Sequence, residues 1–368
     1  MRSVFAPKCI GNRAASWVKC SIVHWGLGYY GPRITTMKGS VMSSTLSCFK
    51  AYDIRGRVPG VINAPLARAL GRAVVEILGA KSVVIGRDAR LSGPELRDAL
   101  ALGLHEAGAQ VTDIGMCGTE EIYYAAANQP FGAGVMITGS HNPADENGFK
   151  LVRGGAIPIS GDSGLFALRD RVAAILAENG SAASAPAAPL HQASFRADYV
   201  AWLLQYSGAG QLVPVAGRKP LKIVADAGNG CAGLVLKDLM SSLPFEFVCR
   251  QMQPDGNFPD GVPNPLLPER RAATAAAVRE AGADMGVAWD GDFDRCFFYD
   301  AEGNFIEGYY CIGLLAQELL RRVPGGKVVY DTRVYWNTRD VVLAAGGQPV
   351  MGKTGHAFMK ERMRAEEA

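Results

Sequence analysis

The chain has 368 residues, 48% of them hydrophobic and 20% charged, which excludes disordered, collagen-like and coiled-coil proteins and leaves room for two or three folded domains. Its formal net charge is +3, but residues 1–52 carry seven Lys and Arg and no acid, so the rest has 31 basic and 35 acidic residues. A basic surface for nucleic acid is therefore not expected. No apolar run approaches the roughly 20 residues of a membrane-spanning helix, so we expect no membrane partner either.

The eight cysteines form no CxxC pair and no disulfide framework, which favours free thiols in a reducing compartment and predicts a cytoplasmic protein. Residues 1–45 form a basic segment that we assign to no domain. They lack the apolar core and cleavage site of a secretory signal, and their missing acids fit a transit peptide without giving a clean amphipathic helix. We favour a translation start at Met37 or Met42, preceded by an upstream extension.

From Phe49 onward, short β-branched runs alternate with helical patterns, which predicts an α/β fold with mixed sheets. Residues 82–88 predict a strand, Pro94 marks the first turn of the helix that follows, and Gly108 ends it before a strand at 110–115. The same order of strand, Asp-bearing turn, helix, Gly stop and strand occurs three times. Any α/β chain contains similar successions of strands and helices, but the Ala-Gly pairs that end the matching helices favour three consecutive related subdomains.

The composition also predicts where these subdomains begin and end. Residues 178–194 are rich in Ala, Ser and Pro without apolar periodicity, as in an interdomain linker, and a turn at 300–304 interrupts two patterned segments. We therefore expect domain I at 46–178, the linker at 179–194, domain II at 195–301 and domain III at 302–368.

The segment 136–152 concentrates reactive groups, because a strand runs into Ser140, His141 and Asn142. Gly139 permits a backbone conformation that other residues resist, which presents the Ser140 hydroxyl at the tip of the loop. Ser, Asn, Pro and Gly are also ordinary turn formers, so the loop alone leaves a structural turn open. Lys150 favours a site: on the next strand it acts as a general acid or base if desolvation or a second cation lowers its pKa.

A second segment places Asp290, Asp292 and Asp294 at alternate positions after a strand. Three close carboxylates repel each other unless a divalent cation neutralises them, and such oxygen ligands suit magnesium. Arg295 beside them is typical of a phosphate site next to a metal. A solvated acidic turn is the alternative, while an EF-hand is excluded because Ala301 stands where its final Glu belongs.

Two further motifs are ambiguous by themselves. Arg55 with Tyr52 in the segment 49–56 fits an anion clamp or the end of a helix. Lys353 and His356, at the end of the third predicted strand, fit a turn or a sugar contact.

In this order and spacing, FKAYDIRG (49–56), GSHNPADENGFK (139–150), DGDFDR (290–295) and KTGH (353–356) resemble the α-D-phosphohexomutases, most of all the bacterial phosphomannomutase/phosphoglucomutase group. The resemblance covers residues 46–368. It implies four domains around a cleft and an enzyme that moves phosphate between C1 and C6 of a phosphorylated hexose. A phosphoserine, Mg²⁺ and a hexose 1,6-bisphosphate intermediate would serve this reaction, whose sugar 1-phosphates supply nucleotide-sugar biosynthesis.

Carried over by motif, the resemblance makes Ser140 the phosphoserine and gives proton transfer to His141 and Lys150. Arg55 joins them as a catalytic residue that shapes the phosphoserine site. Mg²⁺ would be held by the serine phosphate with Asp290, Asp292 and Asp294. The substrate contacts would be Tyr52, Asn142, Arg295, Arg333, Lys353 and His356, with Arg333 at a position where the family also has Lys.

The chain departs from the family after KTGH, because a GEMSGH-like sugar loop and a phosphate-binding fourth domain do not follow. We therefore expect a C-terminally truncated mutase with an incomplete domain III and impaired activity, as a monomer or weak oligomer. An inactive remnant is one alternative. A mutase for another hexose phosphate, such as glucosamine phosphate, is the other, although the segment 147–155 favours mannose or glucose.

Overall fold

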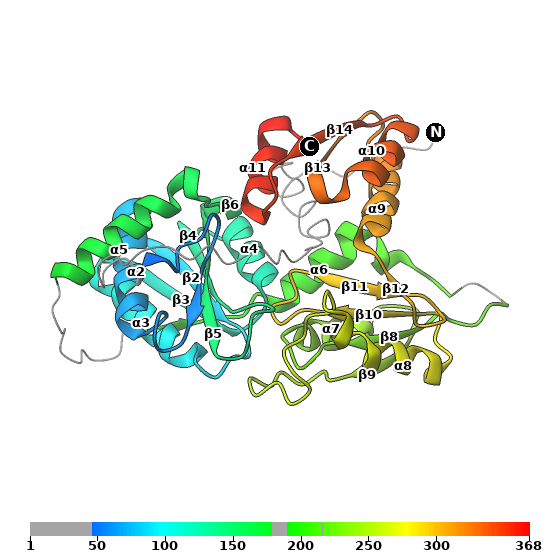
Figure 1. Cartoon of the computed structure of the whole chain (residues 1–368), viewed down its shortest axis with the longest axis horizontal. Coiled ribbons are helices and arrows are strands. Elements are labelled where there is room, and N and C mark those ends of the chain that lie inside the picture. The colour runs from blue at the N-terminus through cyan, green and yellow to red at the C-terminus, as the bar shows by residue number, and fades with distance from the viewer. Residues whose placement is uncertain (1–45, 179–189, 215–216) are drawn as a thin grey trace, which may run out of the picture.

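The computed structural model describes residues 46–178, 190–214 and 217–368, which form three α/β units (Figure 1). We call them domains I, II and III; in Figure 1 they lie at the left, at the lower right and at the top. The predictions for residues 1–45, including the start at Met37 or Met42, lie outside the described residues, as does most of the predicted linker. Within the described residues, no helix is long and apolar enough to cross a membrane.

Domain I is built on a seven-stranded sheet of order β1-β5-β4-β2-β3-β7, with β6 paired to β5. The strands β4, β2, β3 and β7 run parallel, whereas β5 is antiparallel to both β4 and β1. The strands are β1 (Ile54–Arg57), β2 (Ser82–Arg87), β3 (Gln110–Met116), β4 (Ala133–Ile137), β5 (Glu146–Arg153), β6 (Ile157–Pro158) and β7 (His191–Gln192). The helices are α2 (Ala64–Leu78), α3 (Gly93–Glu106), α4 (Thr119–Asn128) and α5 (Phe166–Glu178).

The helices of domain I begin and end at residues whose chemistry suits those positions. The side chain of Asn63 accepts a hydrogen bond from the backbone of Leu66 at the start of α2, and Gly79 ends this helix in the left-handed conformation. Helix α3 crosses α2 so closely that a Cβ at Gly103 would lie 1.9 Å from the carbonyl oxygen of Arg68. The main core forms between these helices and one face of the sheet.

Domain II has a five-stranded mixed sheet of order β12-β11-β10-β8-β9. Its strands are β8 (Lys222–Asp226), β9 (Glu246–Arg250), β10 (Met285–Trp289), β11 (Cys296–Tyr299) and β12 (Phe305–Ile306), and its helices are α6 (Arg196–Ser207), α7 (Ala232–Met240) and α8 (Ala272–Ala281). The turn at 300–304 joins β11 to β12 within this sheet. Strand β12 therefore belongs to the sheet of domain II although it follows residue 301, where the sequence predicted this domain to end.

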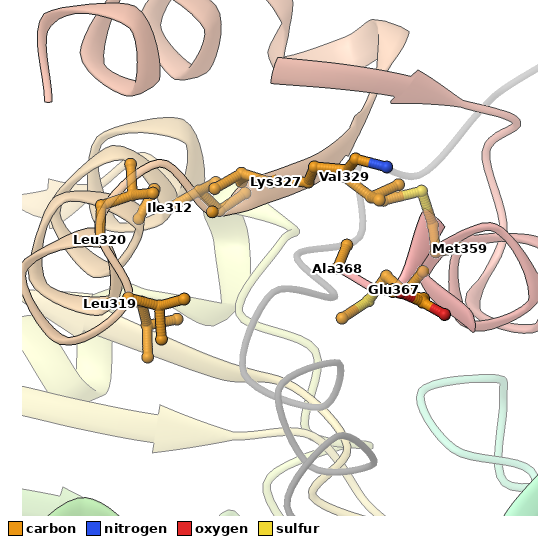
Figure 2. A pocket seen from close by; sticks show the side chains of 13 residues that line it. Ile312, Leu319, Leu320, Lys327, Val329, Met359, Glu367 and Ala368 are labelled. Atoms are coloured by element: carbon orange, nitrogen blue, oxygen red, sulfur yellow. The ribbon is translucent and has the colours of Figure 1, made fainter. Parts of the chain in front are cut away.

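Domain III contains the parallel strands β13 (Lys327–Asp331) and β14 (Gln348–Gly352) with the helices α9 (Gly308–Arg322), α10 (Tyr335–Ala344) and α11 (His356–Glu366). Between α9, β13 and α11 lies an apolar pocket whose wall includes Ile312, Leu320, Val329 and Met359 (Figure 2). The order of strands and helices confirms the predicted α/β class with three consecutive subdomains, in which the two larger sheets are mixed.

The predicted repetition is also visible in the geometry. In each domain the first parallel strand ends at an Asp whose Oδ1 accepts the backbone N–H two residues later. The three distances are 3.0 Å for Asp88, 3.1 Å for Asp226 and 2.9 Å for Asp331. This turn presents the following residue at the carboxyl end of the sheet, where α/β folds place their ligands.

Candidate active site

The Ser140 loop follows β4 at the carboxyl edge of the domain I sheet. Ser140 has φ 50, which is the left-handed conformation, whereas Gly139 is not among the positive-φ residues. The sequence argument that Gly139 supplies unusual backbone freedom is therefore wrong. Gly139 is needed for space instead, because a Cβ there would lie 2.2 Å from the guanidinium of Arg90.

The Ser140 hydroxyl lies at the contact between domains I and II. Its Oγ donates to Oδ2 of Asp290 at 2.7 Å and accepts from Nη2 of Arg295 at 3.0 Å. Nδ1 of His141 is 3.3 Å from the same Oγ and also contacts Arg295. Ser140 is 2% exposed, so one buried hydroxyl joins a carboxylate, a guanidinium and an imidazole.

The three aspartates of the β10–β11 loop form a compact acidic cluster whose ligand oxygens all lie within 4.8 Å of one another. Asp290 and Asp292 are fully buried. Oδ2 of Asp292 accepts from Oγ1 of Thr119 at 2.6 Å and from Nζ of Lys150 at 2.7 Å. In the part of the chain that the structure describes, its other oxygen, Oδ1, is buried without a hydrogen-bond partner.

These aspartates fit a divalent cation. Burial is the largest influence on the pKa of Asp290 and raises it, Arg295 opposes that effect, and Asp292 and Asp294 raise the pKa further. At Asp292, burial and Asp294 also raise the pKa, but Lys150 and Arg55 outweigh them and lower it. The three carboxylates, with Oδ1 of Asp292 lacking a hydrogen-bond partner among the described residues, match the all-oxygen donor sets that hard cations prefer.

The pKa values of Lys150 and His141 are shifted in opposite directions. Burial alone lowers the pKa of Lys150, but the carboxylates of Asp292 and Asp294 outweigh burial and raise it well above its usual value. The condition stated in the sequence analysis, that desolvation or a second cation lowers the pKa of Lys150, is therefore not met. The side chain is an ammonium. Burial, with Arg295 and Arg55, lowers the pKa of His141 to about 2, so its imidazole is neutral.

Arg55 and Tyr52 approach the site from the start of domain I. Nε of Arg55 donates to Asp53 at 2.9 Å, and its Nη1 is buried with no hydrogen-bond partner among the described residues. The ring of Tyr52 meets His356 edge-on with 4.9 Å between centroids. Gly355 makes this contact possible, since a Cβ there would lie 2.9 Å from the Tyr52 ring.

The remaining predicted contacts are less central. Arg333 donates from Nε to both carboxylate oxygens of Asp331 at 3.1 Å, and its charge lowers the pKa of Tyr52 against a larger increase from burial. Lys353 is largely exposed and lies 3.5 Å from Asp162. The amide of Asn142 donates to Glu146 of its own loop at 2.7 Å. Each of these three side chains is therefore paired with a carboxylate: Arg333 with Asp331, Lys353 with Asp162 and Asn142 with Glu146.

Sequence reasoning missed Thr119, Asp88 and Arg90. Thr119 begins α4 and binds Asp292 through both its hydroxyl and its backbone N–H, the latter at 3.1 Å. Asp88 and Arg90 follow β2 and contact the Ser140 loop. The strand-end turn after residue 87 was the available signal, because the carboxyl end of β2 lies beside that of β4.

Comparison with known proteins places the chain in a family. Models of domains I, II and III of phosphoglucomutase/phosphomannomutase, each described as alpha/beta/alpha, match residues 47–180, 198–303 and 307–368. The chain belongs to the phosphoglucomutase/phosphomannomutase family. It is an enzyme of the mutase class, in agreement with the resemblance seen in the four motifs.

Individual relatives support the same assignment. The phosphohexose mutases of Xanthomonas campestris pv. campestris are 56% identical over 324 residues, with 88% of this chain and 70% of the relative covered. A phosphomannomutase of Salmonella typhimurium is 52% identical with the same coverage. A phosphoglucomutase/phosphomannomutase family protein of Burkholderia thailandensis superposes with a TM-score of 0.77 at 36% identity, covering 88% of this chain and 69% of that one.

Proposed function

We propose that this protein is a phosphohexomutase that moves a phosphoryl group between the C1 and C6 oxygens of mannose or glucose phosphate, by way of a phosphoserine at Ser140. The observation that carries the proposal is the 2.7 Å hydrogen bond between Ser140 Oγ and Asp290. It places the one nucleophilic hydroxyl of the SHNP loop on the acidic cluster of another domain. A hydroxyl in such a position is suited to receive and return a phosphoryl group.

Transfer in each direction balances as a simple exchange at phosphorus. A sugar hydroxyl oxygen bonds to the phosphoserine phosphorus, the bond from Ser140 Oγ to phosphorus breaks, and hexose 1,6-bisphosphate forms. After the bisphosphate turns end for end, Ser140 Oγ takes the other phosphoryl group. His141, whose Nδ1 lies 3.3 Å from Ser140 Oγ, and Lys150, which is held as an ammonium on Asp292, are proposed to hold the protons that leave and return.

Asp290, Asp292 and Asp294 are proposed to hold Mg²⁺ together with an oxygen of the serine phosphate. When bound, the ion withdraws negative charge from the group being transferred. Arg295, which donates to Ser140 Oγ, supplies fixed positive charge there. Arg55, whose Nη1 is buried without a hydrogen-bond partner among the described residues, is proposed to add to it. A guanidinium group suits this task because it can donate two parallel hydrogen bonds to two oxygens of one phosphate.

The proposed choice of sugar rests on the relatives, and the proposed sugar contacts rest on the 353–356 loop. Proteins named phosphomannomutase, from Salmonella typhimurium and Escherichia coli, are 52% and 50% identical to this chain. The ring contact between Tyr52 and His356 lies where domain III meets domain I, and we assign both residues, with Arg333, to the sugar phosphate. Lys353 and Asn142 are proposed as contacts at the margin of the same site.

The test is conversion of mannose 1-phosphate and glucose 1-phosphate to their 6-phosphates by the full chain, with Mg²⁺ and a trace of glucose 1,6-bisphosphate. We expect conversion, and we expect Ser140→Ala to abolish it along with the phosphoserine detected by mass spectrometry. Ser82→Ala is the matched control, because this serine of domain I donates to the Pro130 carbonyl away from the site. Conversion that persists in Ser140→Ala, or a wild-type chain that converts neither sugar, contradicts the proposal.

A further inference from the structure

Arg90 is among the largest fully buried side chains of the described residues, with 1% exposed. Its guanidinium points into the Ser140 loop and donates to four backbone carbonyls there. Nη1 donates to Pro143 at 2.5 Å and Glu146 at 2.6 Å, while Nη2 donates to Ser140 at 3.0 Å and Asn142 at 2.6 Å. One planar group therefore fixes both ends of the loop that carries the reactive hydroxyl.

Asp88 pairs with Arg90 and also bonds to the residues that precede Ser140. Its Oδ2 lies 3.3 Å from Nε of Arg90, and the same oxygen accepts from the hydroxyl of Thr138 at 2.8 Å and the backbone of Gly139 at 3.2 Å. A buried guanidinium without such a carboxylate would be costly. The pair is thus electrically balanced and bonded to residues on both sides of Ser140.

Ser140 needs this support because its backbone is left-handed, a conformation that is strained for a residue with a Cβ. The carbonyl of Ser140 is held by Arg90, and its N–H donates to Thr138 Oγ1 at 2.7 Å, which Asp88 holds in turn. Fixing both backbone groups fixes the direction of Oγ toward Asp290.

We propose that Arg90, held by Asp88, is a positioning residue for the phosphoryl transfer, acting through the backbone of the 139–146 loop. The inference rests on the proposed role of Ser140 as the phosphoserine. Arg90 itself touches no reacting atom, since all of its loop contacts are with backbone carbonyls. Its effect is to hold Oγ in line, and small misplacements of a reacting group cost about 100-fold in rate.

The variant Arg90→Lys keeps the charge beside Asp88 but cannot reach four carbonyls from one ammonium. We expect phosphorylation of Ser140 by ³²P-labelled glucose 1,6-bisphosphate to slow by about 10- to 100-fold, and kcat to fall by a similar factor. KM for the hexose phosphate and the stabilisation by Mg²⁺ should stay near wild type, because Tyr52, His356 and the acidic cluster lie outside the loop.

Arg271→Lys is the matched control. This arginine also donates to loop carbonyls, Pro265 at 2.8 Å and Leu266 at 2.9 Å, but in domain II. In the Arg271→Lys variant, Ser140 should be phosphorylated at the wild-type rate. Rescue gives a second measurement: methylguanidinium added to Arg90→Ala should restore part of the rate, whereas a purely structural role predicts no response in folded protein.

Two outcomes overturn the inference while leaving the proposed function intact: Arg90→Lys labels Ser140 at the wild-type rate, or Arg90→Lys and Arg271→Lys slow labelling equally. Failure of the wild-type chain to take up label at Ser140 overturns the proposed function itself. That result would appear before any variant is compared.

Discussion

At the scale of single residues, neighbouring positions in the Ser140 loop carry different constraints. The left-handed backbone falls on Ser140, while Gly139 is constrained by the volume of Arg90. The constraint at Gly139 follows from the guanidinium that packs against the loop. Glycine at position 139 suggests a flexible backbone in the sequence, but in the structure it leaves space for a neighbouring side chain.

Gly139→Ala should reduce both activity and stability. The added methyl would lie 2.2 Å from the Arg90 guanidinium, so the loop or the arginine must move. Overpacking of this kind costs about 1–3 kcal/mol, which urea unfolding would show, and displacement of Ser140 should lower kcat more than it raises KM.

Gly60→Ala is its control, since a Cβ at Gly60 would meet no described atom within 4 Å. Its stability should change by less than about 0.5 kcal/mol, as is usual for open surface sites. Equal stability of the two variants would contradict the steric account.

At the scale of elements, helix α11 joins domain III to domain I (Figure 1). Oγ of Ser163 donates to Glu361 at 2.6 Å, and Nζ of Lys360 lies 3.9 Å from the centre of the Tyr123 ring. Nη2 of Arg364 donates to the carbonyls of Gly155 and Ala156, at 3.2 and 3.1 Å. This one helix therefore fixes the distance from the 353–356 loop, at its start, to Tyr52.

Arg364→Ala should weaken the contact between these domains. The change removes charge-assisted hydrogen bonds to two carbonyls, and hydrogen bonds of charged groups contribute about 1.5–3 kcal/mol net of exchange with water. We expect a loss of about 1–3 kcal/mol in the free energy of unfolding and a higher KM for hexose phosphate, because Tyr52 and His356 would separate more easily.

Arg362→Ala tests the same helix without the interdomain contact, because Arg362 pairs with Glu366 one turn away on α11. Exposed pairs of this spacing contribute about 0.3–0.5 kcal/mol, so unfolding should change little. A loss as large as that of Arg364→Ala would show that α11 is sensitive to any shortened side chain.

At the scale of the whole molecule, the candidate site exists only where domains meet. Ser140 and Lys150 come from domain I and the acidic cluster from domain II, and Thr119 contacts Asp292 from 173 residues away in the sequence. A cation held by the cluster would therefore also stabilise the arrangement of the two domains.

Asp292→Asn should remove the stabilisation by Mg²⁺. Wild-type protein in MgCl₂ should unfold at a higher temperature than in EDTA, and binding at 100 times the Kd corresponds to about 2.7 kcal/mol. The amide lacks the negative charge of the buried carboxylate, so the shift in Tm should disappear.

Asp300→Asn provides the comparison, because Asp300 accepts hydrogen bonds from the backbone and side chain of Asn304, within the 300–304 turn of the same domain. Its Tm should respond to Mg²⁺ as the wild type does. An undiminished response in Asp292→Asn would place the ion elsewhere.

Much of the fold was predictable because its signals are local. β-branched runs, Pro94 at a helix start and Gly108 after its end reflect preferences of neighbouring residues, and β2, α3 and β3 lie at the expected positions. The turn at 300–304 was also recognised, but not its place inside a sheet, since pairing of β12 with β11 is a matter of partners rather than composition.

Residue types at short spacing were enough to predict the α/β class, the family and the reactive motifs, because these signals are local. The groups that surround each side chain depend on how distant segments fold together. The tertiary structure placed Arg90 under Ser140, Thr119 on Asp292, and two carboxylates beside Lys150, so that the pKa of that lysine is raised where burial alone would lower it. Hydrogen bonds and charges act over a few ångströms in space, whatever the separation along the chain, and folding sets those distances.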